Sequence, residues 1–427
     1  MKTLAPVALA AWPRRAAGVA LPLAAWPFLL LPFDSLTHIL GIGESSGAQT
    51  FPATAALSLL YLALRGARLR FTPASLKTFK CLAAVWLIMM LLTAGHMVLE
   101  SVMSTHLEET LRGQTALRQG VSFTLGLSSF LMFQDALQRV GHRAAFRWII
   151  WGCMPAFALA PFQAFTGVNR VQGLSSEPSQ MADTLVFAFL PACAAAALRP
   201  RLRWPLIALG TVTLLSTFSS TGFMKMGLVL LCFYISSGRV LRGLWVLLAG
   251  VAAGYGVLSL WPENYVFSTI TILYRYWDSA SDVLYITFID RYMGLVGPLS
   301  MLNQPRAWLG LGFGADSVYF YQMFDPAVAE AIRDVKWVLP SIGSLQGKVL
   351  MYSGLGGYAV YLAAWLTARR ATPQGHPARY MIPALYLASL FSLAPFFLGY
   401  AWLWLALGST AGAKPPESAA TTARLGT

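Results

Sequence analysis

The sequence predicts an all-α fold, a polytopic bundle of about twelve membrane-spanning helices. Three observations predict it. Of the 427 residues, 57% are hydrophobic and only 11% are charged, whereas soluble domains carry about 25% charged residues. Long apolar stretches recur along the chain, close to the ~20 residues that a helix needs to cross a bilayer. Basic residues gather in short segments between pairs of these stretches.

The apolar segments divide the chain into four parts. We expect nine spanning helices in residues 1–261, a large periplasmic loop with short amphipathic helices at 262–340, three further spanning helices in 341–410, and a disordered tail at 411–427. The predicted spans are 16–33, 50–64, 81–99, 119–137, 147–166, 181–198, 204–217, 222–237, 243–261, 341–366, 380–395 and 397–410.

The distribution of charge predicts the orientation. With the N-terminus inside, the inner stretches hold most of the 31 Lys and Arg residues, and the outer stretches hold most of the 17 Asp and Glu residues. This bias follows the positive-inside rule. It places both termini in the cytoplasm. The net charge of +14 therefore reflects topology, and we expect no nucleic-acid partner.

Cofactor and metal motifs are missing from the sequence. The four cysteines fall in or beside apolar segments without a CxxC pair, and the five histidines are scattered, so we expect no metal site. The run GLGFG (310–314) lacks the lysine of a phosphate-binding loop. We therefore expect neither ATP hydrolysis nor any cofactor.

The predicted outer loop 167–180 contains the first candidate site. Arg170 is suited to hold an anionic group, and Glu177 is suited to act as a general base where partial burial raises its pKa. An ordinary loop is the alternative, with Arg170 paired to an acid and Glu177 preceding Pro178 at a helix start.

The long loop contains the second candidate site. Arg275, Arg291 and Arg306 share it, and several arginines can clamp a pyrophosphate through bidentate bonds. We expect Tyr274 and Trp277 to contact substrate beside them. The alternative is a set of solvated or acid-paired arginines, since acids outnumber bases in this loop.

Two lysines, Lys225 and Lys348, fall inside predicted spans. Charges within a membrane are expensive and point to function by default. Both lie near predicted outer ends, where a lysine can also extend its ammonium group to the surface. We expect them either to bind substrate or to reach solvent in this way.

Three regions resemble the bacterial O-antigen polymerase and O-antigen ligase family of integral-membrane glycosyltransferases. The first is RVQGLSSEPS (170–179), followed by the helix MADTLVFAFLPA (181–192). The second is the serine-containing hairpin LLSTFSSTGFMKMGLVLL (214–231). The third is Arg291 with PRAWLGLGFG (305–314), followed by YSGLGGY (352–358). Together they cover roughly residues 165–365.

The resemblance implies transfer of a glycan from an undecaprenyl-pyrophosphate carrier on the periplasmic face, without metal or nucleotide. Arg170 and Arg291 would then bind the pyrophosphate. The implied partners are lipid-linked donor and acceptor glycans, the bilayer, and a chain-length regulator and flippase of the same pathway. The loop 262–340 lacks the histidine typical of ligases, which favours a polymerase of exopolysaccharide or O-antigen repeat units with Glu177 as base. The alternatives are a ligase acting on lipid A core or protein, and a transporter or flippase of lipid-linked sugars.

Overall fold

A computed structural model describes residues 20–32, 53–65, 69–101, 106–165, 178–196, 198–259, 294, 296–319, 343–392 and 399–412. These residues form helices, turns and bends, and none of them lies in a strand. The all-α prediction is therefore confirmed for the described part of the chain.

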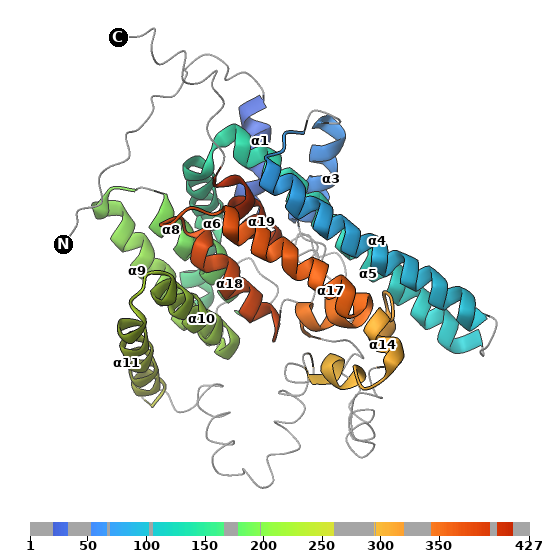
Figure 1. Ribbon diagram of the computed structural model, residues 1–427. Coiled ribbons are helices and arrows are strands. Elements are labelled where there is room, and N and C mark those ends of the chain that lie inside the picture. The colour runs from blue at the N-terminus through green and yellow to red at the C-terminus, as the bar shows by residue number, and fades with distance from the viewer. Residues whose placement is uncertain are drawn as a thin grey trace.

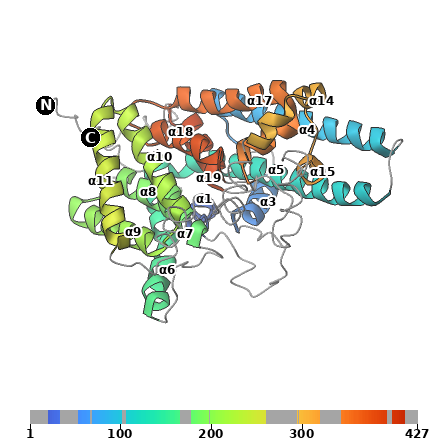
Figure 2. The ribbon, with the colours of Figure 1, turned by 90° about the horizontal axis from the view of Figure 1, so that it is seen from below.

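The longest helices pack along one another. Helix α4 (Pro73–Ser101) runs antiparallel to α5 (His106–Val140), and the pair extends beyond the other helices (Figures 1 and 2). Helix α17 (Leu345–Ala371) lies along α4. Residues 100–118 lie between the predicted spans 81–99 and 119–137, and α4 and α5 extend beyond these spans into them.

The remaining helices lie to one side of the projecting ends of α4 and α5 (Figure 1). Helix α3 packs on α5, α1 on α5 and α6, and α10 on α11 and α18. Two short helices, α14 and α15, lie against α17. The bounds are α1 Ala20–Leu29, α3 Ala53–Arg65, α6 His142–Phe165, α9 Pro200–Ser216, α10 Ser220–Ser236, α11 Val240–Ser259, α14 Pro305–Leu309, α15 Ala315–Tyr319, α18 Ala378–Ser389 and α19 Gly399–Thr410.

Each of the predicted spans overlaps a helix, but only two helices in the described part of the chain are long and apolar enough to cross a membrane. These are Pro73–Val98 in α4 and α17, with mean hydropathies of 2.0 and 1.3. Helices such as α3, α18 and α19 have 12 or 13 residues, fewer than the ~20 that a perpendicular span requires. Membrane association thus rests on two helices.

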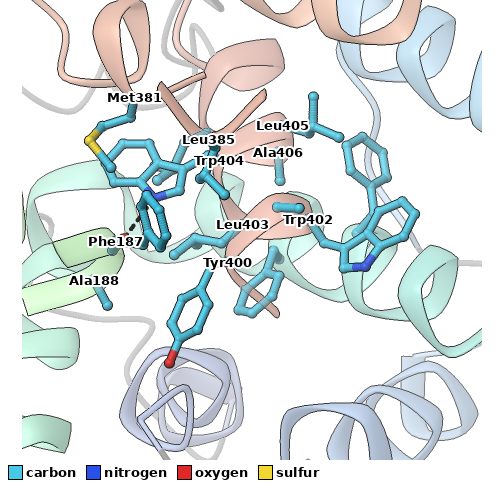
Figure 3. Packing of buried hydrophobic residues seen from close by; sticks show 14 of the residues in the cluster. Phe187, Ala188, Met381, Leu385, Tyr400, Trp402, Leu403, Trp404, Leu405 and Ala406 are labelled. Atoms are coloured by element: carbon cyan, nitrogen blue, oxygen red, sulfur yellow. Dashed lines mark hydrogen bonds between the residues drawn. The ribbon is translucent and has the colours of Figure 1, made fainter. Parts of the chain in front are cut away.

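Helix α19 forms the centre of the bundle. All of its residues are buried, and Trp402 and Trp404 project from it in opposite directions (Figure 3). The indole N–H of Trp404 donates to the backbone oxygen of Phe187 at 2.7 Å. Because Phe187 lies in the π-helix Leu185–Phe189, this bond ties the core helix to an irregular turn. Such π-turns are frequent at functional sites.

The π-helix divides one predicted span into α7 (Pro178–Thr184) and α8 (Leu190–Ala195). The Thr184 and Tyr400 hydroxyls lie 2.6 Å apart and form a second bond to α19. The segment that follows the predicted loop 167–180 is therefore fixed to the core at both its irregular turn and its first helix.

A tight turn lies within the predicted hairpin 214–231. Helix α9 ends at Ser216 and α10 begins at Ser220. Ser219 caps α10, since its hydroxyl accepts a hydrogen bond from the Gly222 amide at 3.2 Å. Phe218, with a φ of 45°, makes the tight reversal.

Candidate functional site

The structure describes three of the predicted site residues. Lys225 is in α10, Lys348 is in α17, and Arg306 is the second residue of α14. Six others lie outside the described residues: Arg170, Glu177, Tyr274, Arg275, Trp277 and Arg291. The geometry of the candidate site is therefore built from the two lysines and the elements that precede them.

Lys225 is buried and forms an ion pair with Asp183. Its ammonium nitrogen lies 2.6 Å from a carboxylate oxygen of Asp183 in α7, and the lysine side chain is 4% exposed. Both charges belong to helices in the apolar interior, where a single charge is stable only if it is paired. Lys225 therefore does not reach solvent in this structure, and that alternative is wrong for this residue.

The Lys225–Asp183 pair adjoins the first predicted site along the chain. Asp183 follows Glu177 by six residues, and Pro178, directly after Glu177, begins α7. The hairpin turn packs on the same helix, because a Cβ on Gly222 would lie 2.5 Å from the Cβ of Ala182. Two of the regions that carry the family resemblance thus meet here.

Lys348 occupies a similar position in the first turn of α17. Its ammonium nitrogen lies 3.8 Å from Asp316 in α15, and both side chains are at most 2% exposed. The Tyr352 hydroxyl donates to the other carboxylate oxygen of Asp316 at 2.6 Å. A carboxylate held by a buried lysine and a tyrosine fixes α15 to α17, so Lys348 also does not extend to solvent.

The GLGFG run lies against a break in α17. Gly354 has a φ of 66° and interrupts the helix, which frees backbone oxygens of the preceding turn. The Leu311 and Gly312 amides donate to the Met351 and Tyr352 oxygens at 2.9 and 3.0 Å. The two halves of the third resemblance region are therefore bonded through their backbones.

Gly294, within the long loop 262–340, also packs on the first turn of α17, which contains Lys348. A Cβ on Gly347 would overlap the backbone oxygen of Gly294, and a Cβ on Gly294 would come within 3.0 Å of Ser344. Gly294 follows Arg291 by three residues. The contact thus joins the chain beside Arg291 to the helical turn that carries Lys348.

Sequence reasoning missed Asp183 as the partner of Lys225 and Asp316 as the partner of Lys348. A signal was present, because a lysine within a predicted span requires a nearby carboxylate. Which lysine pairs with which carboxylate depends on which helices pack together, and the positions of the residues along the chain do not show this.

The opposite ends of these helices carry a second polar cluster. His142 begins α6, and His376 follows α17. The Nδ1 of His142 lies 3.0 Å from the Nε2 of His376, and the Nε2 of His142 lies 3.0 Å from the Thr410 hydroxyl. Burial and the neighbouring His376 lower the pKa of His142 to about 3. Burial lowers the pKa of His376 to about 4. In the sequence the histidines are scattered, and the structure brings these two into contact.

The same end holds a buried carboxylate, Asp135, with Arg65, Arg139 and Tyr61 around it. Within the described residues, no group of three His, Cys, Asp or Glu side chains is arranged to hold a metal ion. Buried ion pairs therefore occur at both ends of the bundle. The two lysine pairs lie at the end next to the predicted outer loops.

Comparisons with protein-family models, with curated proteins and with solved structures found no match.

Proposed function

We propose that the chain is a polymerase of undecaprenyl-pyrophosphate-linked oligosaccharide repeat units, a metal-independent glycosyltransferase in the bacterial inner membrane. The observation that carries the proposal is the pair of buried ammonium–carboxylate contacts. Asp183, the partner of Lys225, lies six residues beyond Glu177, and Lys348 lies in the helical turn that contacts Gly294, three residues after Arg291. Each predicted catalytic loop therefore joins the bundle beside one buried lysine.

The proposed topology has about twelve spans, with the lysines toward the periplasmic ends of their helices. Arg170 and Arg291 bind the donor pyrophosphate and stabilise the negative charge that grows on it as the glycosyl bond breaks. Glu177 takes the proton from the acceptor hydroxyl as that oxygen forms the new glycosidic bond. Arg275, Arg306, Tyr274 and Trp277 contact the glycan.

The test compares surface polysaccharide in a deletion strain complemented with wild type, Arg291→Ala, Glu177→Gln or the control Arg147→Ala. Arg147 is an exposed arginine at the other end of the bundle. The expected result is long polymer with wild type and the control, and single lipid-linked repeats on the outer leaflet with both site variants. Normal polymer from Arg291→Ala would contradict the proposed role of that arginine.

Transport of lipid-linked sugars is a second candidate, favoured by the break at Gly354 and the π-helix at Leu185–Phe189. Discontinuous helices line the substrate sites of many transporters. A flippase differs from a polymerase in where substrate accumulates. Repeats confined to the cytoplasmic leaflet of the deletion strain would indicate transport. Full-length polymer left unattached to its acceptor would indicate a ligase.

A further inference from the structure

Four exposed arginines lie around the last turn of α10, at the end of the bundle opposite the lysine pairs. Arg239 directly precedes α11, Arg242 lies in the first turn of α11, and Arg369 and Arg370 lie in the last turn of α17. We call these four residues the basic rim. Helix α10 packs against both α11 and α18 and lies between them (Figure 1), so its last turn links the two pairs of arginines.

Three contacts fix the positions of the two pairs. The Arg239 amide donates to the backbone oxygen of Tyr234 in α10 at 2.9 Å. Phe233, the residue before Tyr234, packs edge-on against Tyr380 of α18, with ring centroids 5.2 Å apart. Arg379, the residue before Tyr380, donates from Nη1 to a backbone oxygen in the last turn of α17 at 3.2 Å. The start of α11 and the end of α17 are therefore held to the same helix end.

No acidic residue on these helices offsets the charge of the basic rim. The sequence has no Asp or Glu at 184–262 or at 345–416. Among the residues that the structure describes, none of the four arginines forms an ion pair. Arg239 and Arg242 also lie at a helix N-terminus, where the helix dipole disfavours positive charge. A bound anion at this position would be stabilised by both the dipole and the guanidinium groups.

The surface of α11 next to the basic rim is apolar. Four side chains at the i, i+3, i+4, i+7 spacing of a single helix face are between 46% and 76% exposed: Leu241, Leu244, Trp245 and Leu248. Trp245 follows Arg242 by three residues, so the two side chains are neighbours on the helix surface, about one turn apart. Positive charge at the helix end is thus followed by exposed apolar side chains one turn further along.

We propose that the basic rim and this apolar face of α11 bind acidic phospholipids at the membrane surface. A lipid leaflet presents phosphate groups at one depth and acyl chains just below them, which matches the order of charge and apolar surface along α11. Guanidinium groups bind phosphate oxygens in a bidentate way. Tryptophan favours the boundary between headgroups and acyl chains, and a soluble anion would give Trp245 no role. The site lies at the opposite end of α17 from Lys348 and does not depend on the proposed polymerase activity.

The test measures the melting temperature of the purified full-length chain in neutral detergent during titration with phosphatidylglycerol, with phosphatidylcholine as the zwitterionic comparison. The rim variant is Arg239→Gln/Arg242→Gln. The matched control is Arg143→Gln/Arg147→Gln, which removes two exposed arginines from the start of α6 at the same end. We expect the rim variant to weaken the apparent affinity for phosphatidylglycerol by at least about tenfold. We expect the control to leave it unchanged.

Without lipid, the rim variant should melt no lower than wild type, because it removes positive charge from a helix N-terminus. A weakened affinity then reports lost lipid contacts and not lost folding. Equal lipid affinities of the rim variant and the control would overturn the site. Equal stabilisation by glycerol 3-phosphate, which has the phosphate without acyl chains, would overturn the assignment to a lipid. If the rim variant does not fold, Arg369→Gln/Arg370→Gln decides: weakened affinity supports the proposal, and unchanged affinity overturns it.

Discussion

The two ends of α17 treat charge in different ways. At the lysine end, defined by Lys225, Asp183, Lys348 and Asp316, each buried ammonium group has one carboxylate from another helix. At the arginine end, defined by Arg65, Asp135, Arg139, His142 and His376, two guanidinium groups share one carboxylate and two imidazoles remain neutral. α17 spans both ends, with Lys348 in its first turn and Arg369 and Arg370 in its last.

The two ends therefore differ in how they should respond to change. Removing one charge of a buried ion pair leaves the other charge buried without its partner. At the arginine end, Asp135 accepts hydrogen bonds from Tyr61, Arg139 and the Arg70 amide, and the two histidines can take up protons. We therefore expect the lysine end to respond most strongly to single substitutions and the arginine end to respond to pH.

The largest expected effect comes from unpairing Lys225. Lys225→Met leaves the Asp183 carboxylate buried beside an apolar side chain, and it should lower the free energy of unfolding by about 3–5 kcal/mol. The double variant Lys225→Met/Asp183→Leu should recover most of that loss, because neither charge remains. Thermal denaturation in detergent measures both, with the exposed Lys77→Met as control.

A large effect of Lys77→Met, or no recovery in the double variant, would show that charge pairing does not hold this end together. Recovery of stability without recovery of polymer would instead separate the structural role of the pair from a role in substrate binding.

The next effect tests the break in α17. Gly354→Ala places a Cβ at a φ of 66° and against the backbone of Trp308–Gly310, and it should cost about 1–3 kcal/mol in free energy of unfolding. Gly356→Ala is the matched control two residues later, where a Cβ meets nothing within 4 Å. That change should be neutral or stabilise by up to about 1 kcal/mol, since alanine favours a helix. Equal stabilities of the two variants would contradict the packing of the GLGFG run on the break.

The order of helices followed from the sequence because apolar segments and basic loops recur along it. Each of the twelve predicted spans overlaps a helix, but α14, α15 and the π-helix at Leu185–Phe189 were not predicted. The length of the α4–α5 pair was not predicted. Residues 106–118 lie between two predicted spans, yet they belong to α5, which packs against α4.

The candidate site was predicted less completely. Lys225 and Lys348 could be identified as unusual because a charged residue within an apolar segment is recognisable from the sequence alone. Their partners were not, because Asp183 and Asp316 lie 42 and 32 residues away along the chain and the contacts depend on helix packing. The His142–His376 contact spans 234 residues, and no local pattern marks it.

The third effect concerns pH at the arginine end. The backbone amide of Ala378 donates to His376 Nδ1 at 3.2 Å, so neutral His376 carries its proton on Nε2 and donates to His142. Folding lowers the pKa of both imidazoles from an unfolded value of about 6.5, to about 3 for His142 and about 4 for His376. The unfolded chain therefore binds more protons between these values.

The contribution of the pair to stability should be complete above pH 6.5 and should be lost progressively as the pH falls toward 4. Melting temperatures from pH 8 to pH 4 measure it, with His142→Gln as the variant that removes one of the two titrating imidazoles. The wild-type curve should fall more steeply than that of His142→Gln below pH 6.5. Parallel curves would mean that the pKa of His142 does not differ between the folded and the unfolded chain.

The smallest expected effect compares the serines that begin the two lysine helices. Ser219 caps α10 by accepting from the Gly222 amide at 3.2 Å, and its hydroxyl also lies 3.0 Å from the Thr221 hydroxyl within the same turn. Ser344 caps α17 by accepting from the Gly347 amide at 2.9 Å, and its hydroxyl also donates to the Ser389 oxygen at 3.1 Å. Ser219→Ala should cost about 1 kcal/mol in free energy of unfolding. Ser344→Ala should cost more, because it also leaves a buried oxygen of α18 without a donor. A larger loss for Ser219→Ala in denaturation experiments would contradict this order. It would mean that the N-cap of α10 stabilises the fold more than the Ser344 cap of α17 and its bond to α18.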